Sequence, residues 1–167
     1  MRIRINSEEI FVYTITDEYY IKSSEMHKTS TNRLSYQRSR YLLDKKRSNY
    51  PTGEYHHNIS HAETVSSVAF STNPHLGVDI EPFDRKLGKN LLNKLRKKSK
   101  DLEISEIELW CIMESTYKSK KLSSGENFLK YDFYAQDNLF FHESPQGKIA
   151  SHVRKLKDLI LSVSVLV

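Results

Sequence analysis

Two acidic side chains, Asp79 and Glu81, are separated by one residue in segment 77–82, whose sequence is GVDIEP. Successive side chains of a β-strand point to opposite faces, so both carboxylates would share one face while Val78 and Ile80 point into the core. Two unpaired carboxylates repel each other, and a hard divalent cation such as Mg²⁺ relieves the repulsion because it prefers oxygen ligands. The segment is a candidate metal-binding strand, and a solvated strand end is the commoner alternative for this pattern.

A second charged pair, Glu114 and Lys118, lies four residues apart in segment 105–121, for which the sequence predicts a helix beginning at Ser105. The pair shares one side of that helix with Trp110 at spacings of four residues. On an exposed helix this would be an ordinary salt bridge that contributes a few tenths of a kcal/mol. If Trp110 marks a buried side, both charges need polar partners, which favours a functional site.

The third candidate pair, Ser60 and His61, ends the histidine-rich segment 56–61. We expect a half-buried strand over 65–70 and a neighbouring strand over 76–81, joined by a short loop. If the first strand begins level with Ser60 and His61, this pairing would bring both residues near the acids. Three histidines in six residues also suit an exposed polar loop, and zinc is disfavoured because their spacing matches no usual ligand set.

A helix is also predicted over 32–46, where apolar residues recur at helical spacing. Its many basic residues form a solvated face in the simplest interpretation. Arg38 and Ser39, with neighbouring hydroxyls, also suit an anion, because guanidinium and hydroxyl groups donate hydrogen bonds to phosphate.

Residues 85–100, from Arg85 to Lys100, contain eight basic side chains and no acid. Leucines at helical spacing make this segment a predicted basic amphipathic helix. A solvated face is again the simple interpretation. The uncompensated charge favours a partner, and a membrane surface, nucleic acid or an acidic protein would each satisfy it.

The composition describes one folded unit of the α+β class. The chain has 167 residues, of which 38% are hydrophobic, and a net charge of +5 that attracts polyanions without choosing among them. Cys111 is the single cysteine, which excludes an internal disulfide and favours a reducing compartment. No apolar run reaches the length of a signal peptide or membrane span, so we expect a cytoplasmic protein that does not enter membranes.

In chain order, the motifs NISH at 58–61, GVDIE at 77–81 and WCIMESTYK at 110–118 resemble the 4'-phosphopantetheinyl transferases of the monomeric, surfactin-synthetase-activating type. The signatures of that family are a Ser-His pair after a short strand, a Gly-x-Asp-x-Glu strand, and a helix reading Trp-x-x-Lys-Glu-Ala/Ser-x-x-Lys. By motif, the resemblance covers residues 38–118.

The resemblance implies an α+β fold of two pseudo-twofold-related halves, each with a small antiparallel sheet packed on helices. These halves would be residues 1–76, on the coenzyme-binding side, and residues 77–167, with the metal strand, the basic helix and the catalytic helix. They would form one compact unit that acts as a monomer, with the active site in the cleft between them.

The resemblance further implies Mg²⁺-dependent transfer of the 4'-phosphopantetheine group of coenzyme A to a serine of an acyl or peptidyl carrier protein. The implied metal ligands are Asp79, Glu81 and Glu114. The implied catalytic residues are Glu114, Lys118 and His61. The implied coenzyme-binding residues are Arg38, Ser39, Ser60, His61 and Lys118. An acidic carrier protein would dock on the basic segment from Arg85 to Lys100.

The sequence departs from the family pattern in three places. Met113 stands where the family usually has lysine, the N-terminal half is short, and Gly125 alone represents a glycine-rich stretch after the catalytic helix. These departures leave open a degenerate homologue that binds coenzyme A or a carrier protein without turnover. A nucleic-acid-binding module that uses the basic segment is a second, less favoured alternative.

Overall fold

The computed structural model describes residues 1–16, 31–50, 53–120 and 127–167. These residues form an α+β protein with two antiparallel sheets. The N-terminal sheet has the strand order β1-β2-β4-β3. Its strands are β1 (Arg2–Ile5), β2 (Glu8–Thr16), β3 (His56–His61) and β4 (Val65–Ser71).

The C-terminal sheet has the order β5-β9-β8-β7-β6. Its strands are β5 (Leu76–Pro82), β6 (Tyr134–Gln136), β7 (Leu139–Ser144), β8 (Gly147–Leu156) and β9 (Leu159–Leu166). The described helices are α2 (Thr31–Arg47), α3 (Lys89–Asp101), α4 (Glu106–Ser119) and the short 3₁₀ helix η1 (Phe128–Lys130).

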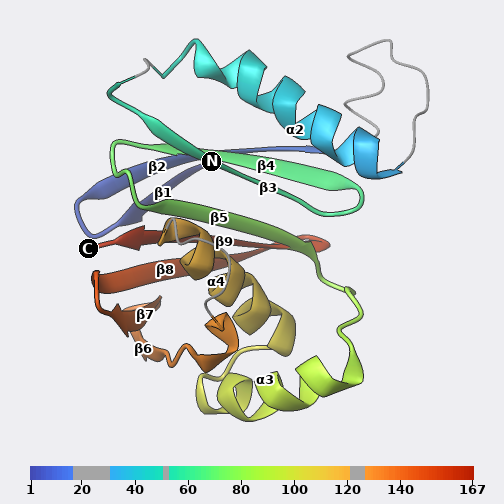
Figure 1. Cartoon of the computed structure of the whole chain (residues 1–167), viewed down its shortest axis with the longest axis vertical. Coiled ribbons are helices and arrows are strands. Elements are labelled where there is room, and N and C mark those ends of the chain that lie inside the picture. The colour runs from blue at the N-terminus through green and yellow to red at the C-terminus, as the bar shows by residue number, and fades with distance from the viewer. Residues whose placement is uncertain (17–30, 51–52, 121–126) are drawn as a thin grey trace.

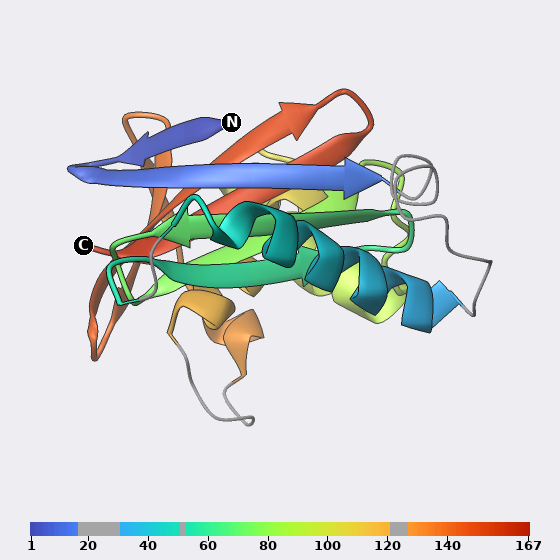
Figure 2. The same ribbon diagram turned by 90° about the horizontal axis from the view of Figure 1, so that it is seen from above.

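The elements stack in layers, with helices outside and the two sheets inside (Figure 1). Helix α2 lies across the N-terminal sheet, as the view from above shows (Figure 2), and α4 lies against the C-terminal sheet with α3 beside it. The inner faces of the sheets share one apolar core, in which Ile10 and Val12 meet Val78 and Val163. The expected boundary between halves, at 76/77, falls at the first residue of β5.

Strand β4 is buried along its whole length rather than on one face only, so the prediction of a half-buried strand was wrong. Val65 and Ala69 face the C-terminal sheet, while Val68 and Phe70 pack in the second core beneath α2. A strand covered on both faces lacks the alternation that marks a half-exposed strand.

Strands β4 and β5 are not paired neighbours, which corrects a second expectation. Both edges of β4 are already occupied, by β2 and β3. The chain therefore crosses to the other sheet, where β5 pairs with β9 and Asp79 lies opposite Ser162. Val78 and Ile80 do point into the core, and the two acids share the opposite face, as predicted.

The helix predictions for α2 and α4 are confirmed, and Ser105 is the N-cap of α4. Helix α3 begins at Lys89 rather than Arg85, because Gly88 takes the N-cap position. Residues 83–88 therefore form a non-helical connection. None of the helices in the described ranges is long and apolar enough to cross a membrane.

Candidate active site

Helix α4 packs directly against β5 at Gly77. A Cβ atom at this position would collide with the Ser115 carbonyl oxygen and lie 2.6 Å from the Ser119 amide nitrogen. The facing strand β9 also has small residues here, and Ser115 Oγ lies 2.8 Å from Ser162 Oγ and 2.7 Å from Ser164 Oγ. Glycine and serine thus allow the helix backbone to approach the sheet, which brings the charged residues of both elements together.

A capping box fixes the start of α4. The Ser105 hydroxyl accepts the Glu108 amide N–H at 3.2 Å, and Glu108 Oε2 accepts the Ser105 amide N–H at 3.0 Å. Burial opposes ionisation of Glu108, but the bonds from Ser105 and the ammonium of Lys155 lower its pKa overall. The cap thus fixes the residue at which α4 begins.

Asp79 lies in a closed hydrogen-bonded triangle. It is 3% exposed, and its Oδ1 accepts from Lys118 Nζ at 2.7 Å and from Ser60 Oγ at 2.8 Å. Lys118 Nζ also donates to Ser60 Oγ at 3.0 Å. The second oxygen of Asp79, Oδ2, is buried and has no hydrogen-bond partner among the described residues. Lys118 compensates the charge of the Asp79 carboxylate at Oδ1, while Oδ2 remains an acceptor that a donor or a cation could fill.

Side chains also join the edges of the two sheets. The Val78 amide donates to Asn58 Oδ1 at 3.1 Å, and the Ile80 amide donates to Ser60 Oγ at 3.4 Å. Lys118 donates to the Val78 carbonyl at 3.2 Å. Ser60 therefore does lie beside Asp79, but because two sheet edges meet and not because β4 and β5 form a hairpin.

Glu81 has different partners from Asp79. It is 4% exposed, and its Oε1 accepts a hydrogen bond from Trp110 Nε1 at 3.3 Å. Arg85 donates to the same oxygen, and its guanidinium carbon lies 5.6 Å from the centre of the Trp110 ring. Glu81 is thus neutralised by a residue from the connection that follows β5.

The carboxyl group of Glu114 lies in the same charged neighbourhood. Burial raises the pKa of Glu114, Asp79 raises it further, and Lys118 and Arg85 oppose these effects. Within the described ranges, no group of three or more His, Cys, Asp or Glu side chains is already arranged around a metal position. The three acids are instead interleaved with two basic side chains.

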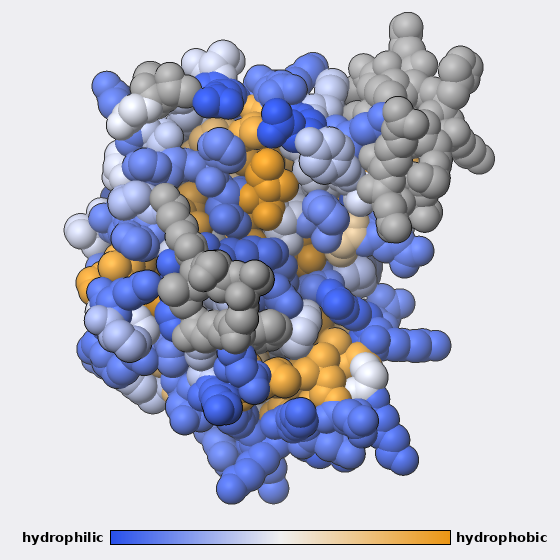
Figure 3. Space-filling view, viewed as in Figure 1, coloured by the Kyte–Doolittle hydropathy of each residue, from blue (hydrophilic) through white to orange (hydrophobic). Residues whose placement is uncertain are grey.

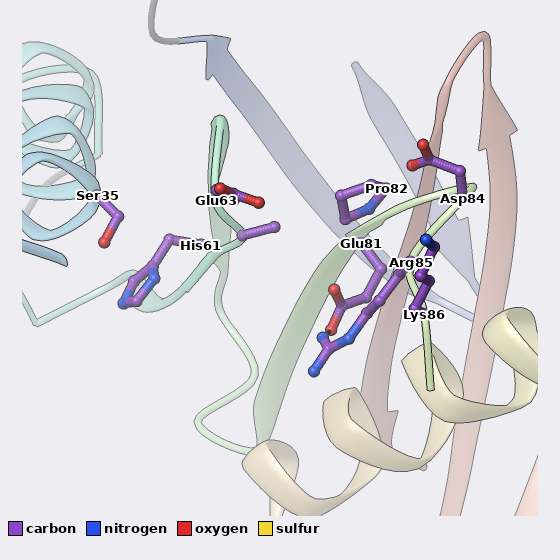
Figure 4. A pocket seen from close by; sticks show the side chains of 9 residues that line it. Ser35, His61, Glu63, Glu81, Pro82, Asp84, Arg85 and Lys86 are labelled. Atoms are coloured by element: carbon purple, nitrogen blue, oxygen red, sulfur yellow. Dashed lines mark hydrogen bonds and ion pairs between the residues drawn. The ribbon is translucent and has the colours of Figure 1, made fainter. Parts of the chain in front are cut away.

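A pocket of about 720 Å³ opens beside this cluster. Figure 4 shows His61 and Glu63 on one side of it and Glu81 and Arg85 on the other. The other lining residues are Ser35, Ala62, Pro82, Asp84 and Lys86. Partial burial lowers the pKa of His61, and the nearby Lys118 adds to this effect, so its imidazole is neutral near pH 7.

Arg38 and Ser39 are buried within the N-terminal half. The Arg38 guanidinium donates to the carbonyl oxygens of Ala62 and Val65, both at 2.8 Å, and burial lowers its pKa to about 10, so it stays charged near pH 7. The Ser39 hydroxyl donates to a carbonyl one turn earlier in α2. Arg38 therefore holds the turn that follows His61, and contact of either residue with a coenzyme stays a prediction.

Sequence reasoning missed the part that Arg85 plays beside the acids. It assigned Arg85 to a basic helix, whereas the side chain lies in the pocket on Glu81. The only signal was the four-residue spacing from Glu81, which has no fixed meaning outside a helix. Gly125, noted above as a remnant of a glycine-rich stretch, lies outside the described residues.

No family model matches the sequence, and no curated protein matches it. The resemblance to the phosphopantetheinyl transferases stays a prediction, and two observations bear on it. These are the three motifs in order and the contact that the structure makes among Ser60, Asp79 and Lys118, one residue from each motif.

Proposed function

We propose that this protein transfers the 4'-phosphopantetheine group of coenzyme A to a serine hydroxyl of an acyl or peptidyl carrier protein. The observation that carries the proposal is the triangle of Ser60, Asp79 and Lys118 beside a pocket of about 720 Å³. The three residues come from β3, β5 and α4, and Ser60 and Lys118 are 58 positions apart in the sequence. The proposal includes a pseudo-twofold relation between the two halves, which the division into two antiparallel sheets supports.

The acids of the site suit Mg²⁺. Asp79, Glu81 and Glu114 offer the oxygen ligands that this ion prefers, and Oδ2 of Asp79 has no hydrogen-bond partner among the described residues. These three residues would hold the ion, which when bound supplies charge neutralisation to the diphosphate of the coenzyme. In the structure, Lys118 is paired with Asp79 and Arg85 with Glu81, so a bound ion would compete with these two basic side chains for the carboxylates.

His61 in the pocket, and Lys118 and Glu114 of the neighbouring charged cluster, support the remaining steps. The diphosphate of coenzyme A would lie in the pocket, with Lys118 providing positive charge and the neutral His61 donating a hydrogen bond to a phosphate oxygen. Glu114 would accept the proton of the carrier serine hydroxyl as the general base. The serine oxygen attacks the β-phosphate, the bond between the two phosphates breaks, and adenosine 3',5'-bisphosphate leaves.

The carrier protein would dock on the basic segment 85–100. Figure 3 shows hydrophilic side chains covering the α3 end of the molecule, at the bottom of the view. Lys89, Lys94 and Lys97 on α3 are exposed, and they would attract the acidic surface of a carrier protein.

One observation favours a second candidate, a relative that binds without turnover. Met113, at the position of the family's usual lysine, is fully buried and packs with Leu95, Leu109 and Tyr131. The chain thus lacks one positive charge that the family places next to its metal-binding glutamate. In this alternative, Arg85 and Lys118 neutralise the acids permanently.

Transfer is tested by incubating the purified chain with coenzyme A, Mg²⁺ and a panel of apo carrier proteins, and weighing each carrier by mass spectrometry. We expect at least one carrier to gain one phosphopantetheine group. Asp79→Ala and Glu114→Ala should abolish the gain, while Asp158→Ala, which removes a carboxylate that is 82% exposed, should not. Bound coenzyme without a mass gain on any carrier supports the second candidate, and a chain that binds neither refutes both.

A further inference from the structure

The Glu81 carboxylate is buried but depends on a movable partner for its neutralisation. Its side chain is 6% exposed, whereas that of Arg85 is 39% exposed. Arg85 belongs to the non-helical residues 83–88 between β5 and α3. A buried carboxylate requires a positive group, so Glu81 cannot lose Arg85 without gaining another cation.

Arg85 and a divalent cation would compete for the same carboxylate, that of Glu81. Arg85 donates to Glu81 Oε1, the oxygen that also accepts from Trp110, and its charge also acts on Glu114. A guanidinium and a divalent cation on one carboxylate oxygen would repel each other strongly at this separation. We infer that Arg85 is an internal counter-ion that must leave Glu81 before a divalent cation can bind, an inference that rests on the metal role proposed above for Glu81.

Lys118 does not share this behaviour. Its ammonium group makes three hydrogen bonds, to Asp79 Oδ1, Ser60 Oγ and the Val78 carbonyl, and its side chain is 26% exposed. Lys118 is carried by the last turn of helix α4, which packs against β5, whereas Arg85 is carried by a non-helical connection. Of the two basic residues among the acids, Arg85 is the one that can swing out.

The displaced guanidinium would remain in the pocket, which Arg85 lines together with His61 and Lys86. There it suits a phosphate oxygen, because guanidinium groups bind phosphate with paired hydrogen bonds. Cation and diphosphate should therefore bind with positive cooperativity: the cation frees Arg85, and the phosphate gives it a new partner.

Trp110 provides the measurement, because it is the single tryptophan of the chain and contacts both Glu81 and Arg85. The full-length chain is titrated with MgCl₂ and MnCl₂ at constant ionic strength while Trp110 fluorescence is recorded, and binding is checked by calorimetry. The variants are Arg85→Gln, Lys86→Gln and Glu81→Gln, with folding of each verified by circular dichroism. Lys86→Gln is the matched control, because it removes the same charge from the next residue in the same pocket.

We expect Arg85→Gln to bind either cation on the order of tenfold more tightly than the unaltered chain, as removal of a competing, partly exposed ion pair predicts. Lys86→Gln should change the affinity by less than about twofold, which is the effect of a distant charge in salt. Glu81→Gln should bind more weakly. Pyrophosphate should increase Mn²⁺ affinity in the unaltered chain and lose this effect in Arg85→Gln.

Equal or weaker cation binding by Arg85→Gln overturns the inference, and so does a Lys86→Gln effect of the same size. Absence of cation binding in Arg85→Gln by both methods overturns it as well. The mass-spectrometric assay decides the transferase function separately. If the chain transfers the group but Arg85→Gln does not change cation affinity, only the counter-ion role of Arg85 is disproved. If Arg85→Gln changes cation affinity but the chain transfers nothing, only the transferase function is disproved.

Discussion

Asp79 and Glu81 lie two residues apart on one face of β5 and are almost equally buried, yet they are neutralised in opposite ways. Asp79 is bonded to Lys118 of α4 and Ser60 of β3, both on regular elements of the fold. Glu81 is bonded to Arg85, from an irregular connection at the rim of the pocket.

The difference shows that one carboxylate of a site can have a counter-ion on a regular element while its neighbour has a counter-ion that can be exchanged. Ordered secondary structure fixes both ends of the Asp79–Lys118 pair, so that pair contributes to the joining of the sheets. The Glu81–Arg85 pair has one end on a strand and the other on a non-helical connection, so another cation can replace the guanidinium while β5 and α4 stay in place. We therefore expect Asp79 to contribute mainly to stability and Glu81 mainly to cation binding.

The largest effect is expected at Gly77, where helix α4 packs against the strand that carries both acids. Gly77→Ala should destabilise the protein by roughly 3 kcal/mol or more, because the new methyl group meets helix backbone rather than a movable side chain. Urea denaturation followed by circular dichroism measures this loss. Gly88→Ala is the control, since a Cβ there meets no atom within 4 Å. Similar stabilities for the two variants would show that α4 can shift away from β5.

The next change tests the comparison directly, by removing the basic partner of each acid. Lys118→Met should cost about 2 kcal/mol, because it leaves a buried Asp79 without its counter-ion. Arg85→Gln should cost less, about 1 kcal/mol, because the Arg85 side chain is partly solvated and Trp110 still donates a hydrogen bond to Glu81 Oε1. Both free energies of unfolding come from the same urea titrations, and a larger loss for Arg85→Gln would reverse the assignment of fixed and exchangeable partners.

A third change tests how the two sheets are joined. Ser60→Ala should cost about 1–2 kcal/mol, since the hydroxyl bonds to Asp79, Lys118 and the Ile80 amide. Its strand neighbour Ser67 provides a matched control, because the Ser67 hydroxyl is buried without a hydrogen-bond partner in the described structure. Ser67→Ala should be nearly neutral in thermal unfolding. Equal losses would mean that burial of the hydroxyl, and not its bonds, matters.

Local sequence patterns predicted most of the elements correctly. The alternation in 77–82 predicted the side of β5 on which the acids lie, and helical spacing predicted α2 and α4. The patterns failed for β4, because burial on both faces erases alternation, and at Arg85, because a loop has no periodicity that fixes the direction of a side chain.

The sequence by itself determined that Asp79 and Glu81 share a face, that Ser105 starts the helix bearing Glu114, and that the chain forms an α+β unit. These properties depend on contacts between residues a few positions apart, which local periodicity and capping encode. Only the tertiary structure decided that β3 meets β5 edge to edge, that Lys118 reaches Asp79, and that Arg85 turns back onto Glu81. Such contacts depend on the packing of two sheets and a helix, and the energy of that packing is shared among residues that no local pattern connects.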